Sequence, residues 1–179
     1  MEAYFQGKKE LFEGLAIASL EKDWTEYPVL HFDLSGASYT DMEALNDKIG
    51  RQLETLESRF GVVKKYKTFP VRLDNLIECA FNKTGRQVVI LIDEYDKPVI
   101  DNLDRPELQD RMRETLRGFY GVMKGHGGFI HFAFLTGVTK LGKMSVFSDL
   151  NNLTDISMDK EYSDICGVSE TDLAEYFAE

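Results

Sequence analysis

Val88–Lys97, with the sequence VVILIDEYDK, decides the fold of this chain. Its first five residues are apolar without interruption, which is typical of a strand buried on both faces of a parallel sheet. Two acids, Asp93 and Glu94, follow the apolar run directly. In open α/β folds, ligands bind at the carboxyl ends of the strands, so these acids mark a candidate site.

Two further runs, Pro28–Leu34 and Gly128–Leu135, have the same buried-strand character. Apolar residues recur at helical spacing in three stretches between these runs, at 40–61, 73–85 and 106–125. Thr40 is expected to cap the first of these helices, with Glu43 reaching back to it. Strands that alternate with helices predict one α/β domain over 1–179, with a parallel sheet and helices on both faces.

The ends of the chain are less regular. Met1–Phe12 has a helical pattern, although Tyr4–Gly7 could also be the remnant of an engineered protease site. One short strand is expected around Ile156. A capping-box-like start at Ser169 predicts a helix that runs to Glu179.

The two acids after the central run suggest a chemistry. An apolar strand that ends in Asp-Glu has the form of a Walker B motif. Mg²⁺ prefers hard oxygen ligands and keeps several waters, so Asp93 is a candidate to hold this ion. Glu94 is then placed to orient or deprotonate the water that attacks the γ-phosphate of ATP. Two alternatives stay open: a solvated loop that caps the strand, and a metal-dependent phosphohydrolase using Asp93, Glu94 and Asp96.

Thr136 ends the third expected strand and stands at the sensor position of many P-loop ATPases, where its hydroxyl would position water or contact the γ-phosphate. The plain alternative is a threonine that merely ends a strand. The next residues, Gly137–Met144, have the glycine and lysine spacing of a phosphate loop. Met144 replaces the hydroxyl that binds magnesium, and the loop follows the Walker B strand instead of preceding it. Lys140 and Lys143 are therefore interpreted as basic residues near an anion site or in solvent.

Charge and composition exclude several classes of function. Lys and Arg number 21 and Asp and Glu number 31, which gives a net charge of −10. Such a surface repels phosphate backbones and anionic lipid, so we expect neither direct nucleic-acid binding nor membrane binding. Cys79 and Cys166 have no metal-binding spacing, and the histidines are scattered, at His31, His126 and His131. We expect a reduced, cytoplasmic protein without a histidine-rich ligand set.

Four segments resemble the AAA-ATPase-like family of bacterial P-loop NTPases, whose members often carry a C-terminal nuclease-like domain. They are VVILIDEYDKPV at 88–99, AYFQGKKELFEGLAI at 3–17, FLTGVTKLGKMSVFSDLNNLTDIS at 134–157 and EYSDICGVSETDL at 161–173. The resemblance implies a three-layer P-loop NTPase-like sheet, with ATP and Mg²⁺ as cofactors of the complete domain. It also implies that Asp93 and Glu94 are the Walker B acids and Thr136 the sensor-like residue.

The resemblance further implies a first strand and a Gly-Lys-Ser phosphate loop ahead of Ala3, which residues 1–179 do not contain. We expect that strand to lie between the sensor strand and the strand near Ile156. Two hypotheses follow. The chain is the core of an ATP-binding and ATP-hydrolysing domain that binds nucleotide weakly by itself, or it is a non-catalytic interaction module or truncated gene product. The sequence does not indicate what hydrolysis would drive, the oligomeric state or a protein partner.

Overall fold

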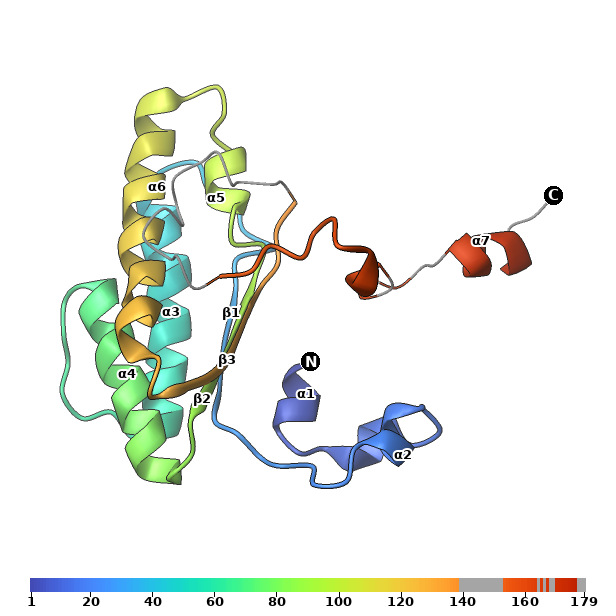
Figure 1. The fold of residues 1–179 in the computed structure, drawn as a ribbon. Coiled ribbons are helices and arrows are strands. Elements are labelled where there is room, and N and C mark those ends of the chain that lie inside the picture. Colours follow the sequence, from blue (N-terminus) through green and yellow to red (C-terminus); the bar gives the residue numbers. More distant parts are fainter. Residues whose placement is uncertain (139–152, 164, 166, 168–169, 177–179) are drawn as a thin grey trace.

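The computed structural model describes residues 1–138, 153–163, 165, 167 and 170–176 (Figure 1). Three strands, β1 (Val29–Asp33), β2 (Val88–Asp93) and β3 (Ile130–Leu135), fall where the apolar runs predicted them. The helices are α1 (Glu2–Phe5), η1 (Lys9–Phe12), α2 (Ile17–Leu20), α3 (Met42–Phe60), α4 (Phe69–Thr84), α5 (Lys97–Ile100), α6 (Pro106–Gly121), η2 (Val122–His126), η4 (Lys160–Tyr162) and α7 (Glu170–Tyr176). The η elements are 3₁₀ turns.

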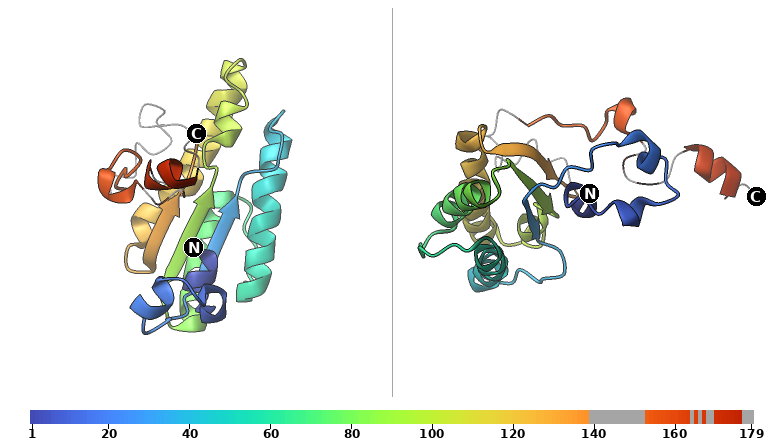
Figure 2. Two further views of the ribbon diagram at one scale, coloured as in Figure 1. Left: turned by 90° about the vertical axis from the view of Figure 1, so that its right-hand side faces the viewer. Right: turned by 90° about the horizontal axis from the view of Figure 1, so that it is seen from below.

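The three strands form a parallel sheet in the order β1-β2-β3. The strand that carries the two acids is therefore the central one, as the left view of Figure 2 shows. Its residues from Val88 to Leu91 are at most 6% exposed, which confirms the expectation of a strand buried on both faces. Asp33 pairs with Asp93 in the register of β1 and β2, so the carboxyl ends of these strands are level.

Long helices cover one face of the sheet. α3, α4 and α6 lie together on that face in Figure 1. Helix α3 turns a stripe of apolar residues toward the sheet, Leu45, Ile49, Leu53, Leu56 and Phe60. Each fully buried side chain of this kind contributes roughly 1.5–3 kcal/mol to stability. The core that positions the candidate site is therefore built mainly between this face and the three helices.

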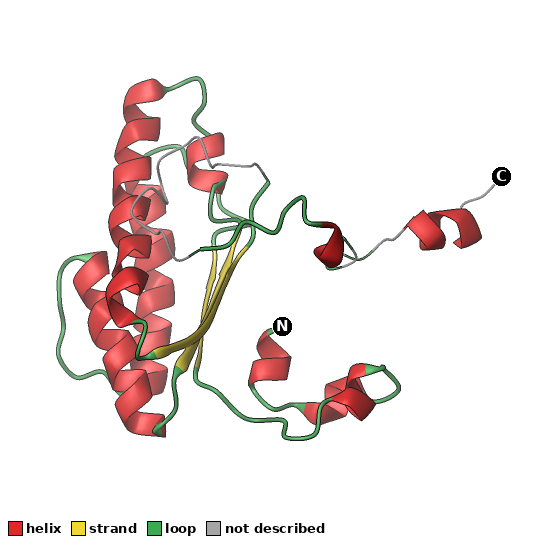
Figure 3. Ribbon diagram, viewed as in Figure 1, coloured by secondary structure: helices red, strands yellow, loops and turns green. Residues whose placement is uncertain are grey.

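The other face of the sheet carries a thinner layer. Val29, Val89 and Leu91 form a separate small core there, and Phe5 from α1 packs against it. The Tyr27 amide donates to the Phe5 carbonyl at 2.7 Å, which ties the N-terminal segment to the start of β1. The prediction of helices on both faces is confirmed, and the helices that the described residues form on this side are short (Figure 3).

Local signals account for the helix ends. Gly61 and Gly85 end α3 and α4 in left-handed conformations, with φ of 72° and 65°, as glycine permits. The predicted cap of α3 was wrong by one residue. The Asp41 side chain accepts from the Ala44 amide at 2.9 Å, and Asp is as good a cap as Thr. The Thr40 hydroxyl instead points at the Asp41 carboxylate, at 3.4 Å.

Two terminal predictions need correction. Met1–Phe12 is not one continuous helix, because Gly7 has φ of 68° and separates α1 from η1. A side chain at Gly7 would approach the Trp24 carbonyl to 2.9 Å, so the break is also a close contact between chain segments. The strand expected around Ile156 does not form, since 153–156 has no regular structure. The C-terminal helix is confirmed over Glu170–Tyr176, and the rest of its expected range, 169 and 177–179, lies outside the described residues.

Among the described residues, β3 pairs only with β2, so its other side is an edge of the sheet. Phe132 on this strand is 37% exposed, unlike the apolar residues of β2. In the same part of the chain, none of the helices combines the length and the apolar character that crossing a membrane requires.

Candidate functional site

The acids predicted from the sequence lie at the carboxyl edge of the sheet. The loops that follow all three strands leave the sheet at this one end (Figure 3). Asp93 is exposed at the last position of β2, and Thr136 follows the last residue of β3. The Thr136 hydroxyl donates a hydrogen bond to Oδ1 of Asp93. The structure therefore brings together two of the residues that the sequence singled out, from segments 43 positions apart.

Main-chain hydrogen bonds hold this edge. The Thr136 amide donates to the Ile92 carbonyl at 2.9 Å, and the Tyr95 amide donates to the Thr136 carbonyl at 3.0 Å. The Leu34 amide donates to the Asp93 carbonyl at 2.9 Å from the other side. Strand pairing thus continues past the ends of the strands, and it fixes the backbone on which Asp93 and Thr136 sit.

Glu94 has an unusual backbone conformation. Its φ is 51°, in the left-handed region that residues other than glycine rarely adopt. Such a residue costs on the order of 1 kcal/mol and persists only where its surroundings enforce it. Here the Tyr95 amide is hydrogen-bonded to the Thr136 carbonyl. The chain therefore turns sharply at Glu94 before it enters α5. Strain of this kind is concentrated at functional sites, although structural turns also carry it.

Asp96 has a different setting from the two acids before it. It is fully buried, and its Oδ1 accepts from the Val138 amide at 3.2 Å. A Cβ atom at Gly137 would lie 2.7 Å from that same oxygen, so only glycine fits there. Asp96 therefore supports the backbone just after Thr136 and does not share the exposed position of Asp93. The sequence showed the acid but not its burial.

Asp33 is a site residue that the sequence analysis missed. It ends β1 opposite Asp93, and its Oδ1 accepts from the Ser35 amide at 2.7 Å. Hydrogen bonds from Ser35, the side chain first, hold the pKa of Asp33 below its usual range, and the nearby Lys48 adds to this effect. The available signal was that the first apolar run, Pro28–Leu34, has an acid at its second-to-last position, Asp33.

The donors at this edge fit a hard divalent cation. Asp93 and Asp33 offer carboxylate oxygens, and Thr136 offers a hydroxyl, which are the ligand types that Mg²⁺ takes. Asp33 is ionised at neutral pH, and its lowered pKa extends the charged state into more acidic solution. The two lysines assigned to a possible anion site, Lys140 and Lys143, lie outside the described residues.

Comparison with known proteins identifies the family of this chain. A family model described as "AAA-ATPase_like: Predicted AAA-ATPase" matches residues 1–147. A curated protein of Azotobacter chroococcum mcd 1, named "Uncharacterized protein in vnfD 5'region", is 41% identical over 175 residues. That match covers 97% of this chain but 34% of the relative, so the chain spans about a third of the relative's length. No solved structure matches the chain significantly. The family match covers most of the sequence, and the chain therefore belongs to the AAA-ATPase-like family.

Proposed function

We propose that this chain is the core of an ATP-binding and ATP-hydrolysing domain, with its magnesium and water-activating groups at the carboxyl edge of the sheet. The observation that carries the proposal is the hydrogen bond between Thr136 and Asp93 at the ends of neighbouring parallel strands. In open α/β sheets this edge is where ligands bind. Membership of a family described as predicted AAA-ATPases supports the same reaction.

Each residue has a distinct role in this proposal. Asp93 would hold Mg²⁺. The Thr136 hydroxyl donates a hydrogen bond to Oδ1 of Asp93 and would thereby fix the orientation of the Asp93 carboxylate. Glu94 would accept a proton from, or orient, the water that attacks the γ-phosphate. Mg²⁺ held there would supply positive charge that offsets the charge developing on the phosphate. Asp33 would add negative charge next to Asp93 and favour cation binding at this edge.

The phosphates of ATP need further groups. Residues 1–179 contain no complete Gly-x-x-x-x-Gly-Lys-Ser/Thr loop, because Met144 stands at the hydroxyl position of the nearest match. Lys140 and Lys143 are proposed to contribute positive charge near the phosphates. We propose that the main phosphate cradle comes from sequence outside this chain, which is compatible with the greater length of the curated relative.

Substitution of Glu94 by Gln in the full-length protein tests the proposal. The amide keeps the size of the side chain but cannot accept the proton, so we expect kcat for MgATP hydrolysis to fall by about 100-fold or more. Nucleotide affinity is expected to change less than threefold, measured by titration with a fluorescent ATP analogue. Glu107→Gln, at an exposed position in the first turn of α6, is the matched control and should leave kcat unchanged.

A second pair of variants tests the sensor role. Thr136→Val removes the hydroxyl that binds Asp93 and should lower kcat by about tenfold or more, whereas Thr136→Ser retains a hydroxyl and should keep most of the wild-type kcat.

Unchanged hydrolysis in Glu94→Gln would overturn the assignment of the water-activating residue. Complete absence of hydrolysis in the full-length wild type would favour the alternative, a non-catalytic interaction module.

A further inference from the structure

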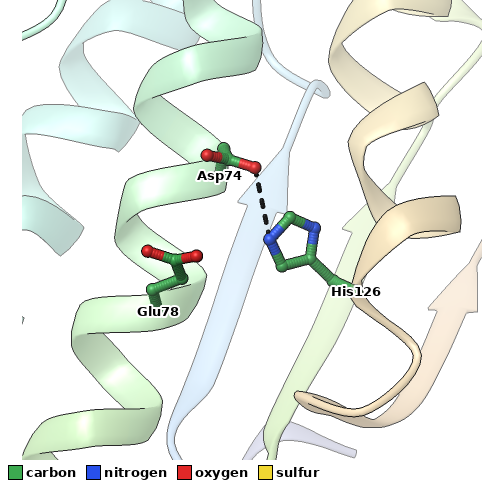
Figure 4. A group of neighbouring side chains, drawn as sticks. All are labelled: Asp74, Glu78 and His126. Atoms are coloured by element: carbon green, nitrogen blue, oxygen red, sulfur yellow. Dashed lines mark ion pairs between the residues drawn. The ribbon is translucent and has the colours of Figure 1, made fainter.

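A second group of ionisable side chains lies at the opposite end of β3 from Thr136. Asp74 and Glu78 lie one turn apart on α4, and His126 ends the 3₁₀ turn η2 that leads into β3. Figure 4 shows both carboxylates and the imidazole turned toward the same space between these elements. One ligand atom from each of the three residues can be chosen so that all lie within 4.8 Å of one another.

The hydrogen bonds of His126 decide which of its nitrogens carries a proton. Nδ1 lies 3.0 Å from the carbonyl oxygen of Val122, which can only accept. Nδ1 must therefore carry a hydrogen and donate it. In a neutral imidazole the other nitrogen, Nε2, is then an acceptor with its lone pair directed outward.

That lone pair meets another acceptor. Nε2 of His126 lies 3.2 Å from Oδ1 of Asp74, so in the neutral state two acceptors would face each other without a proton between them. The side chain of His126 is buried, at 11% exposure, whereas the side chain of Asp74 is about half exposed, at 49%. A positive centre between the two atoms would turn this contact into an attraction. It can be a second proton on the imidazole or a metal ion bound by both groups.

Glu78 favours the metal ion. Its carboxylate is the third member of the group, yet in the described part of the chain it forms no hydrogen bond or ion pair. A proton on Nε2 would engage Asp74 alone, and the exposed Glu78 would stay in solvent. A metal ion on Nε2 would use all three groups.

We propose that Asp74, Glu78 and His126 bind a transition-metal ion of the zinc class. Metal-bound histidines characteristically donate their other ring N–H to a backbone carbonyl, as His126 does to Val122. A ligand set of one imidazole and two carboxylates suits Zn²⁺ better than Mg²⁺, which avoids nitrogen. Zn²⁺ binds such ligands at about 2.0–2.2 Å, so the exposed Glu78 side chain must close in on the ion.

The ion would act as a brace. It would join α4 to the turn just before β3, while the candidate ATP site lies at the other end of that strand. Three protein ligands would leave one tetrahedral position, which water would fill. The proposal is independent of nucleotide hydrolysis, and either can fail without the other.

Titration of chelator-treated protein with ZnCl₂ tests the proposal. Calorimetry measures the binding, and the rise in Tm on addition of Zn²⁺ gives an independent measure of it. We expect binding of one ion per chain. Glu78→Gln should weaken it at least tenfold while leaving the metal-free Tm unchanged, because Glu78 is exposed. His126→Gln should have at least the same effect on binding. Two controls should stay within twofold of the wild type: Cys79→Ser, which removes the neighbouring thiol, and Glu54→Gln, at an exposed acid on α3.

Co²⁺ gives a second readout, because its visible absorption reports the ligands and their geometry. Tetrahedral bands that disappear in His126→Gln are expected. Absence of Zn²⁺ binding, or binding that Glu78→Gln leaves unchanged, would overturn the proposal. Loss of binding in Cys79→Ser would also overturn it, since the thiol would then be the ligand.

Discussion

Gly137→Ala is the sharpest test of how the candidate ATP site is held in place. Gly137 directly follows Thr136, and a Cβ atom built there would lie 2.7 Å from Oδ1 and 2.9 Å from Cγ of Asp96. It would also lie 2.6 Å from a ring carbon of Tyr95. Contacts below 3.0 Å require a shift of the neighbours. Asp96 is fully buried, so its carboxylate cannot move into solvent to make room.

The expected cost follows from two effects. Forcing an extra methyl group into a well-packed site costs about 1–3 kcal/mol. If Asp96 moves, it also loses the hydrogen bond from the Val138 amide at 3.2 Å, and an average hydrogen bond contributes about 0.5–1.5 kcal/mol. We therefore expect a loss of about 2–4 kcal/mol in the free energy of unfolding. In a chain of this size that loss corresponds to a decrease in Tm of roughly 4–16 °C.

Urea unfolding and thermal melting, both followed by far-UV circular dichroism, measure this loss. Gly127→Ala is the matched control, because it lies just before β3 and no atom approaches within 4 Å of its Cβ position. Gly127 has φ of −53° and ψ of −29°, which alanine adopts readily, so its variant should be neutral or slightly more stable. A Gly137→Ala protein with the stability of Gly127→Ala would refute the packing argument. The same substitution should also lower ATP hydrolysis in the full-length protein, because it displaces the backbone that carries Thr136.

Three further predictions concern charge and nucleotide binding. Glu57→Gln should reduce stability by about 2–4 kcal/mol in urea unfolding, because Glu57 accepts two hydrogen bonds from Arg72, at 2.8 and 2.9 Å, and both side chains are nearly buried. Asp33→Asn should lower stability at neutral pH. Because the pKa of Asp33 is depressed in the folded state, its contribution is present above the unfolded pKa, near 4, and disappears as pH falls through the folded pKa. Calorimetric titration of chain 1–179 with ATP and Mg²⁺ should detect weak binding or none.

Each of these predictions has a contrary result. A Glu57→Gln protein as stable as the wild type would show that the pair with Arg72 adds little. A stability difference between Asp33→Asn and wild type that stays constant as the pH is lowered from 7 until the wild type unfolds would contradict the pKa argument. Micromolar affinity of chain 1–179 for ATP would mean that its own residues suffice to hold the phosphates.

Local patterns in the sequence predicted the architecture well. The continuous apolar runs identified all three strands, and their alternation with helical stretches indicated the parallel sheet. These signals are short-range, because a strand or a helix needs only its own periodicity and end signals to be recognised. Besides the strand expected around Ile156, two predictions failed at local choices that tertiary contacts settled. Asp41 replaced Thr40 as the cap, and Gly7 broke the first helix where it meets Trp24.

The sequence by itself determined the fold class, the position of the Asp93-Glu94 pair at the end of a buried strand, and the family resemblance that the family model confirmed. Only the tertiary structure decided which side chains meet. It joined Thr136 to Asp93, buried Asp96 beneath Gly137, and brought His126 to the acids of α4. The physical reason is that periodicity acts along the chain. Contacts between residues 40 or more positions apart depend instead on sheet register and helix packing, which local periodicity does not specify.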